Sequence, residues 1–374
     1  MPEYRQYELG SVCARLSSGK GIPASQVFNE GAFPVYGGNG LRGYTDHSNF
    51  RGDCAIIGRQ GAFCGNVRYF NGEAYMTEHA VVVCANECHN TRYLAYLLSQ
   101  MNLGRLSGQS AQPGLSVKTL AKQVIELPPL DVQNKVVAVL SSLDSKIALN
   151  EKINDNLQQQ AYAYFLQLFV ENANPSWRVG TIADLGTVVG GGTPSKAKPE
   201  YYTDDGIAWI TPKDLSIDKS KFIAHGENDI SELGYRNSSA TMMPAGTVLF
   251  SSRAPIGYIA IASNEVTTNQ GFKSVVPRPG IGTPFVYYFL IHNLPLIESK
   301  ASGSTFKEVS GSVMKSVEAV IPDGDTIAKF NAFCRPVFEM QEKLEQENRK
   351  LAAMRDSLLP RLMSGEIDVS DISI

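Results

Sequence analysis

The feature of this chain that most constrains its fold is an internal repeat, in which two segments about 194 residues apart follow the same order of motifs. In the first copy, Leu127-Pro128 precedes a long helical pattern that begins at residues 131–135. In the second copy, Ile321-Pro322 precedes another that begins at residues 325–329. A repeat of this length is too large for one unit of a solenoid and has the size of a whole domain plus a helix.

The repeat extends upstream of these helices. Thr77-Glu78-His79 in the first copy stands where Thr268-Asn269-Gln270 stands in the second. Two similar modules on one chain suit a ligand that has two similar halves, and double-stranded nucleic acid is the commonest ligand of that kind.

Length and composition indicate a globular protein of two or three domains. The chain has 374 residues, of which 43% are hydrophobic and 19% are charged. The sequence contains no apolar run of membrane-spanning length, and its first residues (1–6) lack the apolar core of a signal peptide. The six cysteines are therefore expected to be reduced thiols, and a cytoplasmic location is expected.

The net charge of −3 does not favour a chain that holds DNA by charge alone. A slightly acidic protein gains little affinity from counterion release. Either the chain does not bind DNA, or partner subunits provide most of the phosphate contacts; we favour the second interpretation.

The sequence predicts an α+β protein with four segments. Residues 1–130 form a first mixed α/β module, 131–170 a central helical spacer, 171–322 a second module and 323–374 a C-terminal helical spacer and tail. The predicted strands are 54–57, 80–84 and 124–127 in the first module, and 207–210, 247–250, 259–262 and 273–276 in the second. Helices are predicted at 92–101 and 284–292.

The two spacers carry long helical patterns. Apolar residues recur at heptad spacing from Val136 to Leu168, with Asn150 and Asn154 on the same seam, and Asp131 is the predicted N-cap. The second helix is expected from Asp325 to about residue 364, followed by a glycine C-cap at 365. Antiparallel packing of the two helices closes the repeat around a pseudo-two-fold axis. Because the two modules differ in most residues, they would recognise different halves of an asymmetric, bipartite target.

Several blocks resemble the specificity subunits of type I restriction-modification systems. In the first module these are residues 33–44 (FPVYGGNGLRGY), 57–65 (IGRQGAFCG) and 110–116 (SAQPGLS). In the second they are residues 190–195 (GGGTPS) and 209–215 (WITPKDL). Residues 127–130 (LPPL) and 358–367 (LLPRLMSGEI) resemble the helical regions of that family. Each block is short, but their order and duplication cover nearly the whole chain.

The resemblance implies a non-catalytic subunit that recognises double-stranded DNA. It also implies two modification (methyltransferase) subunits as partners, which carry S-adenosylmethionine and methylate adenine, and restriction/translocase subunits that join them. No cofactor is expected on this chain itself, and the helices are expected to act as spacer and docking surface.

Other chemistry is poorly supported by the sequence. The glycine-rich segment 190–196 lacks the spacing of a phosphate-binding loop, and Pro194 removes a backbone donor from it. Cys84, Cys88 and His89 have no second pair of zinc ligands at finger-like spacing. The acidic pairs at 204–205 and 323–325 suit turns or helix caps, and an Asn-Pro-Pro-aromatic methylation loop is missing. We predict no catalytic residue and no metal site.

The predicted DNA contacts are side chains in turn-like segments at motif positions, where Arg suits guanine, Asn and Gln suit adenine, and Lys, Ser and Thr suit phosphates. They are Asn39, Arg42, Arg59, Gln60, Gln109 and Gln112 in the first module, and Thr193, Lys196, Lys213, Arg253, Asn269, Gln270, Ser304, Thr305 and Lys307 in the second. Some of them have a simpler interpretation: Asn39, between glycines, suits a left-handed turn, and Asn269 suits a strand cap. Arg59 and Arg253 are the strongest candidates.

Two other functions stay open at this stage. The repeated modules suit a scaffold whose two ends bind proteins, with the helices as a rod for oligomerisation. An undetected metal-dependent enzyme is a further alternative, and it predicts bound metal and a loss of activity when Cys84 or His79 is replaced.

Overall fold

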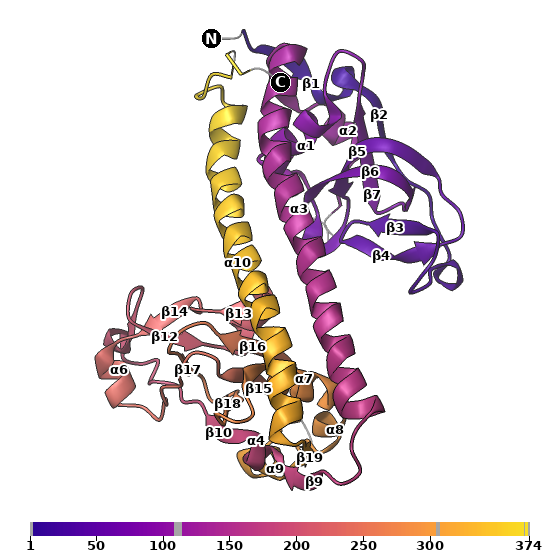
Figure 1. Ribbon diagram of the computed structural model, residues 1–374. Coiled ribbons are helices and arrows are strands. Elements are labelled where there is room, and N and C mark those ends of the chain that lie inside the picture. The colour runs from indigo at the N-terminus through magenta and orange to yellow at the C-terminus, as the bar shows by residue number, and fades with distance from the viewer. Residues whose placement is uncertain (1–2, 108–113, 304–306, 370, 373–374) are drawn as a thin grey trace. The chain divides into compact units, whose positions relative to one another are not determined.

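A computed structural model describes residues 3–107, 114–303, 307–369 and 371–372 (Figure 1). The chain divides into two compact units. The first contains Met1–Ile147 with Lys350–Ile374, and the second contains Ala148–Arg349. None of the helices in the described part of the chain combines the length and the apolar character that a membrane span requires.

The first module is built on a six-stranded sheet with the strand order β2-β7-β5-β6-β3-β4. The four strands from β2 to β6 pair antiparallel, and β3 joins β6 in parallel. A separate antiparallel pair, β1–β8, lies outside this sheet. The strands are β1 (Arg5–Glu8), β2 (Cys13–Ser18), β3 (Phe33–Gly37), β4 (Gly40–Thr45), β5 (Phe50–Gly58), β6 (Val67–Met76), β7 (Ala80–Ala85) and β8 (Val124–Leu127).

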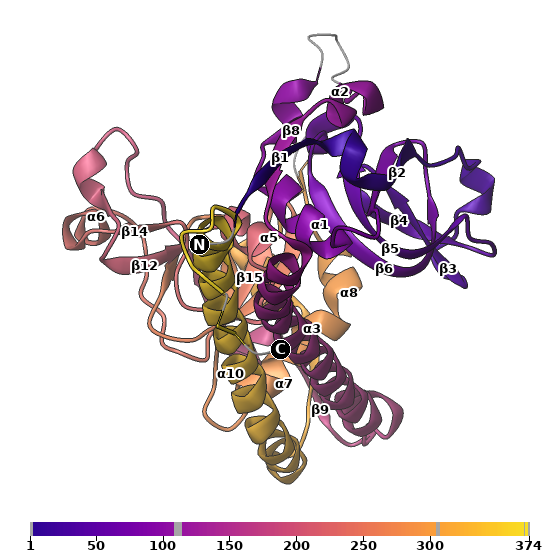
Figure 2. The same ribbon diagram turned by 90° about the horizontal axis from the view of Figure 1, so that it is seen from above.

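Both faces of this sheet are buried at its centre. Ala55 and Ile57 of β5 contribute to one apolar cluster, whereas Cys54 and Ile56 contribute to another, as the two-residue period of a strand requires. The first cluster is covered by α1 (Thr91–Ser99), which lies against the sheet in Figures 1 and 2, and α2 (Val117–Ala121) is a shorter helix. Asn90 caps α1, because its Oδ1 accepts hydrogen bonds from the backbone N–H groups of Arg92 and Tyr93 at 2.9 and 3.0 Å.

The second module contains a five-stranded sheet with the order β10-β18-β15-β16-β13 and a four-stranded sheet with the order β11-β14-β12-β17. Its separate pair is β9–β19. The strands are β9 (Arg178–Thr181), β10 (Gly186–Gly190), β11 (Tyr202–Thr203), β12 (Ile207–Ile210), β13 (Phe222–Ile223), β14 (Asn228–Ile230), β15 (Val248–Ser252), β16 (Ile256–Ala262), β17 (Thr267–Thr268), β18 (Lys273–Pro277) and β19 (Glu318–Ile321). Its helices are α4 (Ile182–Leu185), α5 (Pro212–Ile217), α6 (Glu232–Arg236), α7 (Thr283–His292), α8 (Leu294–Ser299) and α9 (Gly311–Ser316).

The internal repeat is visible in the connectivity of the sheets. The run β2-β7-β5-β6 in the first module and the run β10-β18-β15-β16 in the second have the same order and the same antiparallel pairing. Each run is then extended by a strand in parallel, β3 on β6 and β13 on β16. The predicted fold class, two α/β modules with an internal repeat and two long helices, is therefore confirmed.

The two long helices are α3 (Leu130–Leu166), which continues into a π-helical turn at Gln167–Glu171, and α10 (Gly324–Met363). At 1.5 Å per residue they are about 55 and 60 Å long. Asp131 is not the N-cap that the sequence suggested, because α3 already begins at Leu130 and places Asp131 in its first turn. The predicted glycine C-cap is confirmed, since Gly365 follows α10 with a φ of +74°.

Inside the second unit the two helices run antiparallel. Asn150 Nδ2 donates to Glu347 Oε2 at 2.8 Å, and further along α3 the ring of Tyr164 lies 4.8 Å from that of Phe333. As the residue numbers increase along α3, the residue numbers of their partners on α10 decrease. Asn150 is fully buried, as its seam position predicts. The four segment boundaries proposed from the sequence stay a prediction, because each compact unit takes a part of both helices.

Candidate nucleic-acid interface

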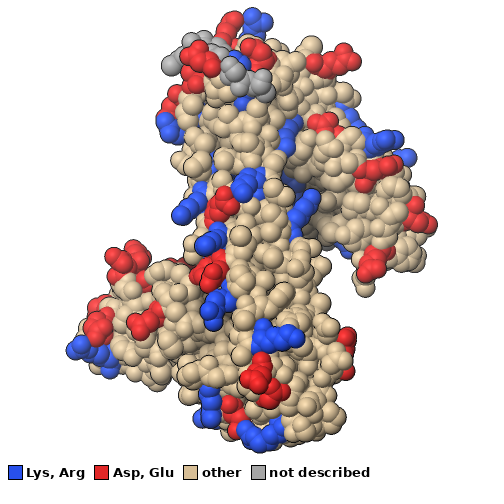
Figure 3. All heavy atoms as spheres, viewed as in Figure 1, with Lys and Arg blue, Asp and Glu red and all other residues tan. Residues whose placement is uncertain are grey.

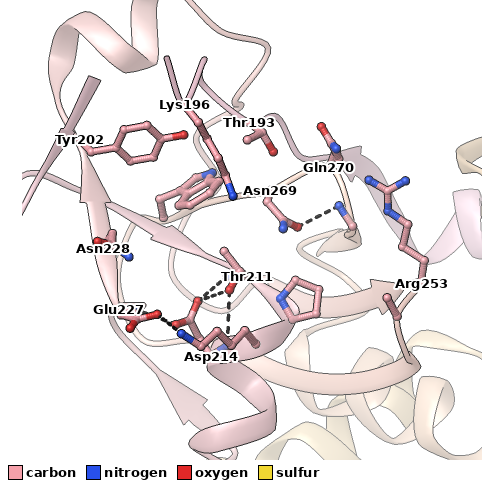
Figure 4. A pocket seen from close by; sticks show the side chains of 15 residues that line it. Thr193, Lys196, Tyr202, Thr211, Asp214, Glu227, Asn228, Arg253, Asn269 and Gln270 are labelled. Atoms are coloured by element: carbon pink, nitrogen blue, oxygen red, sulfur yellow. Dashed lines mark hydrogen bonds and ion pairs between the residues drawn. The ribbon is translucent and has the colours of Figure 1, made fainter. Parts of the chain in front are cut away.

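Six of the nine candidates in the second module line one cavity of about 680 Å³. The cavity lies among loops of the second module, and Figure 4 shows Glu227 and Asn228 on the side opposite Arg253 and Gln270. The six are Thr193, Lys196, Lys213, Arg253, Asn269 and Gln270. The other lining residues were not among the predicted contacts; they are Tyr202, Trp209, Thr211, Pro212, Asp214, Glu227, Asn228, Ala254 and Gly271.

Residues 209 and 211–214 of the block at 209–215 line this cavity. Trp209 Nε1 donates to the carbonyl of Gly192 at 2.9 Å, which fastens β12 to the glycine-rich loop. Thr211 and Asp214 form a capping box at the start of α5, in which Asp214 Oδ2 accepts from Thr211 N at 2.7 Å and from Thr211 Oγ1 at 2.6 Å. The motif is therefore largely structural, and within it Lys213 is an exposed cation that lines the cavity.

The glycines at 191 and 192 are needed for packing inside the protein. A Cβ atom at Gly191 would lie 2.0 Å from the carbonyl oxygen of Asn269, and one at Gly192 would lie 2.3 Å from the backbone nitrogen of Ala240. At Gly190, by contrast, an added Cβ meets nothing within 4 Å. Close approach to a phosphate therefore accounts for neither Gly191 nor Gly192.

The side chains of Asn269 and Gln270 differ in their hydrogen bonding and exposure. Asn269 Oδ1 accepts from the backbone N–H of Gly271 at 2.8 Å, so this side chain stabilises the turn that directly follows β17. Among the residues described, its Nδ2 group has no hydrogen-bond partner, and Asn269 lines the cavity. Gln270 is exposed at the cavity wall.

The charges that line the cavity are mixed. Lys213 Nζ lies 2.5 Å from Glu227 Oε2, and this hydrogen bond raises the pKa of Lys213. Arg253 Nη1 lies 3.4 Å from Glu308 Oε2, while Lys196 has no ion-pair partner among the residues described. Over the face of the molecule in Figure 3, basic and acidic side chains are likewise interspersed. The interface carries little net positive charge, which agrees with the total of −3.

In the first module, Asn39, Arg59 and Gln60 lie on neighbouring loops. Asn39 is in the turn between β3 and β4, and Arg59 and Gln60 directly follow β5. A Cβ atom at Gly38 would lie 3.5 Å from Arg59 N, so the turn approaches the end of β5 closely. Asn39 does not have the left-handed conformation suggested by its flanking glycines; Gly40 has it instead, with a φ of +97°.

Arg42 lies on β4 close to the same turn, since a Cβ atom at Gly37 would lie 2.8 Å from Arg42 Cδ. Arg68 is a cation that was not among the predicted contacts. Its Nη1 lies 2.6 Å from the position a Cβ atom would take at Gly40, so its guanidinium covers the β3–β4 turn. The pairing of β6 with β5 brings Arg68 there, and no motif in the sequence signals that contact.

The two modules place their strongest candidates at equivalent strand ends. Arg59 directly follows β5, and Arg253 directly follows β15, the strand with the same place in the repeated sheet. In each module, a residue later in the chain forms a backbone hydrogen bond at this strand end. Leu115 N donates to Arg59 O at 2.8 Å, and Val309 N donates to Ser252 O at 3.0 Å. The repeat thus positions one arginine in each module.

The remaining predicted contacts are not gathered with these. Lys307 is exposed and does not line the cavity, although its neighbour Glu308 pairs with Arg253. Gln109, Gln112, Ser304 and Thr305 lie outside the described residues.

Residues considered for metal chemistry have structural contacts. His89 Nδ1 lies 3.1 Å from Gln133 Nε2, and burial raises the pKa of the Cys84 thiol. Asp323 caps α10, with its Oδ1 accepting from Thr326 N at 2.8 Å. Among the described residues, no group of three or more His, Cys, Asp or Glu side chains is arranged to hold a metal ion.

The fold defines a protein of two repeated α/β modules, each of which has the same central strand order and a polar loop cluster at the same end of its sheet. Residues 1–159 and 174–330 match the model of the type I restriction modification DNA specificity domain, and the chain belongs to this family. The predicted resemblance is thereby confirmed.

Relatives include two type I restriction enzyme specificity subunits. MjaIX from Methanocaldococcus jannaschii is 38% identical over 47% of this chain and 41% of its own length. EcoprrI from Escherichia coli is 35% identical over 38% of this chain and 36% of its own length. The chain thus spans less than half of the length of either relative. The crystal structure of a type I restriction-modification S subunit from M. genitalium has the same fold, with a TM-score of 0.66 over 96% of both chains at 16% identity.

Proposed function

We propose that this chain is a DNA-recognition subunit that reads an asymmetric, bipartite site and directs partner methyltransferase and restriction subunits to it. The observation that carries the proposal is the duplicated placement of Arg59 and Arg253 at equivalent strand ends of two modules that belong to the DNA specificity family. The names of the two relatives, both specificity subunits of type I restriction enzymes, support the same role.

The loop clusters offer the side chains that base reading requires. Arginine presents two donors to guanine O6 and N7, and an amide presents a donor and an acceptor to adenine. In the second module, Arg253, Asn269 and Gln270 line one cavity with Lys196, a cation suited to a phosphate. The first module has Arg42 and Arg59 with Asn39 and Gln60. Because the two sets differ, we propose that they read different half-sites.

The chemistry is proposed to reside on the partners. In this account, two modification subunits carry S-adenosylmethionine and methylate adenine, restriction/translocase subunits join them, and this chain contributes no catalytic group and binds no cofactor. The mixed charge of the cavity supports the idea that partners provide most phosphate contacts. Exposed apolar side chains on the long helices, such as Leu149 and Met340, support docking of partners there. A cytoplasmic location is part of the same proposal.

The test is DNA binding by the chain purified together with its cognate methyltransferase subunit, measured at several salt concentrations. We expect the affinity to fall linearly with salt on a logarithmic scale, and we expect the complex to methylate adenines in a split motif. The methyltransferase subunit alone is the control and should show no motif. A complex that forms but neither binds DNA nor methylates a motif would favour the protein-binding scaffold.

A further inference from the structure

Glu227 is an exposed carboxylate in a cavity proposed to receive DNA. Its side chain is 58% exposed and lines the cavity with Asn228, across from Arg253 and Gln270 (Figure 4). A carboxylate gains nothing from a phosphate backbone, which repels it. Among the groups that DNA presents, the exocyclic amino groups of the bases are the donors that a carboxylate can accept from, and cytosine N4 is the usual one.

The position of Glu227 is held by buried structure. Its backbone N–H donates to Oδ1 of the buried Asp214 at 2.8 Å, and the same carboxylate forms the capping box with Thr211. The preceding residue must be small, because a Cβ atom at Gly226 would lie 2.6 Å from Trp209 O and 2.8 Å from Asp214 Oδ2. Glu227 is therefore presented to the cavity from a fixed backbone.

Lys213 places a donor beside this acceptor. Its Nζ lies 2.5 Å from Glu227 Oε2, and it is exposed on the first turn of α5. In the major groove, a G·C pair presents the guanine acceptors O6 and N7 next to the donor N4 of cytosine. A lysine and a glutamate side by side complement that pattern. In the free protein, the two side chains form an ion pair with each other.

We propose that Lys213 and Glu227 are a specificity-determining pair that reads a G·C base pair in the half-site of the second module. Lys213 donates to guanine and Glu227 accepts from cytosine N4, so the ion pair of the free protein opens when DNA enters. This inference rests on the proposed DNA-recognition function.

The experiment selects duplexes from a library with randomised positions, using the complex of this chain with its cognate methyltransferase subunit. The variants are Glu227→Ala, which removes the proposed acceptor, and, as a matched control, Glu232→Ala. Glu232 is similarly exposed, at 61%, and is also ion-paired, with Arg236 Nε at 2.8 Å, but it lies on α6 and does not line the cavity.

The wild type is expected to select a bipartite motif that contains a G·C pair in the second half-site. Glu227→Ala should lose discrimination at that one pair by about 5- to 150-fold and keep the rest of the motif, whereas Glu232→Ala keeps all of it. Three results overturn the inference: an unchanged motif in Glu227→Ala, an equal loss at every position, or tighter binding without a change in motif, which indicates simple charge repulsion. A wild-type complex that selects no motif contradicts the proposed function itself. Thermal unfolding of both variants excludes a loss of fold as the cause.

Discussion

Lys221 Nζ donates a hydrogen bond to Gln341 Oε1 at 2.8 Å, although both side chains are buried. Lys221 directly precedes β13 of the second module, and Gln341 is on α10. The same Nζ donates to Gln158 Oε1 of α3 at 3.0 Å and lies 3.4 Å from the centre of the Phe338 ring. One lysine therefore joins the module to both long helices within its compact unit.

This burial predicts a pH-dependent stability. Desolvation lowers the pKa of Lys221 from 10.5 to about 6, so between these values the unfolded chain holds a proton that the folded chain lacks. The free energy of unfolding then rises with pH across that window, by up to about 1.4 kcal/mol per pH unit from this group. In Lys221→Met this contribution is absent. The free energy of unfolding of the wild type should therefore increase relative to that of the variant as pH rises. Urea unfolding at pH 7, 8 and 9 measures the difference.

Lys219→Met is the control for this prediction, because Lys219 is exposed two residues away. It should follow the pH dependence of the wild type. Curves for wild type and Lys221→Met that stay parallel from pH 7 to 9 would show that Lys221 does not change its protonation on folding.

Glu345 of α10 also joins the helix to this module, by accepting hydrogen bonds from its backbone. Its carboxylate accepts from Lys221 N at 2.9 Å and from Phe222 N at 3.0 Å, and burial raises its pKa. Glu345→Ala leaves two buried N–H groups without an acceptor, so we expect a loss of about 2–5 kcal/mol in unfolding free energy. Glu339→Ala, on the exposed side of α10, should change it by less than about 0.5 kcal/mol. Equal losses in the two variants would contradict this role for Glu345.

The repeat, the long helices and most central strands could be predicted from the sequence, because they depend on local periodicity. The roles of Lys221 and Glu345 could not, because in the sequence both residues look like ordinary exposed charges. Only the packing of β13 against α10 buries them. In the cavity, Lys213 was proposed from its motif, but Glu227 was missed. The 209–215 block signals a helix cap, whereas the bond from Glu227 N to Asp214 depends on tertiary packing.

Substitutions in the glycine-rich loop distinguish glycines that internal packing requires from glycines that it does not. Gly191→Ala places a Cβ atom 2.0 Å from Asn269 O, so we expect a loss of about 1–3 kcal/mol in unfolding free energy and weaker DNA binding. Gly190→Ala meets no atom within 4 Å and should leave stability nearly unchanged. Thermal unfolding and DNA titration of both variants check this. A stable, fully active Gly191→Ala would refute the packing explanation.

The central claim is that each module reads its own half-site, and sequencing of methylated adenines in cells that express the chain with its cognate methyltransferase tests it most directly. The variants are Arg59→Ala and Arg253→Ala, with Arg51→Ala and Arg236→Ala as controls at exposed arginines away from the two loop clusters. We predict that Arg59→Ala relaxes the motif in one half-site and Arg253→Ala in the other, each by about 1–3 kcal/mol of discrimination, while the controls keep the wild-type motif. Relaxation of the same half-site by both variants, or an unchanged motif in both, would contradict the account.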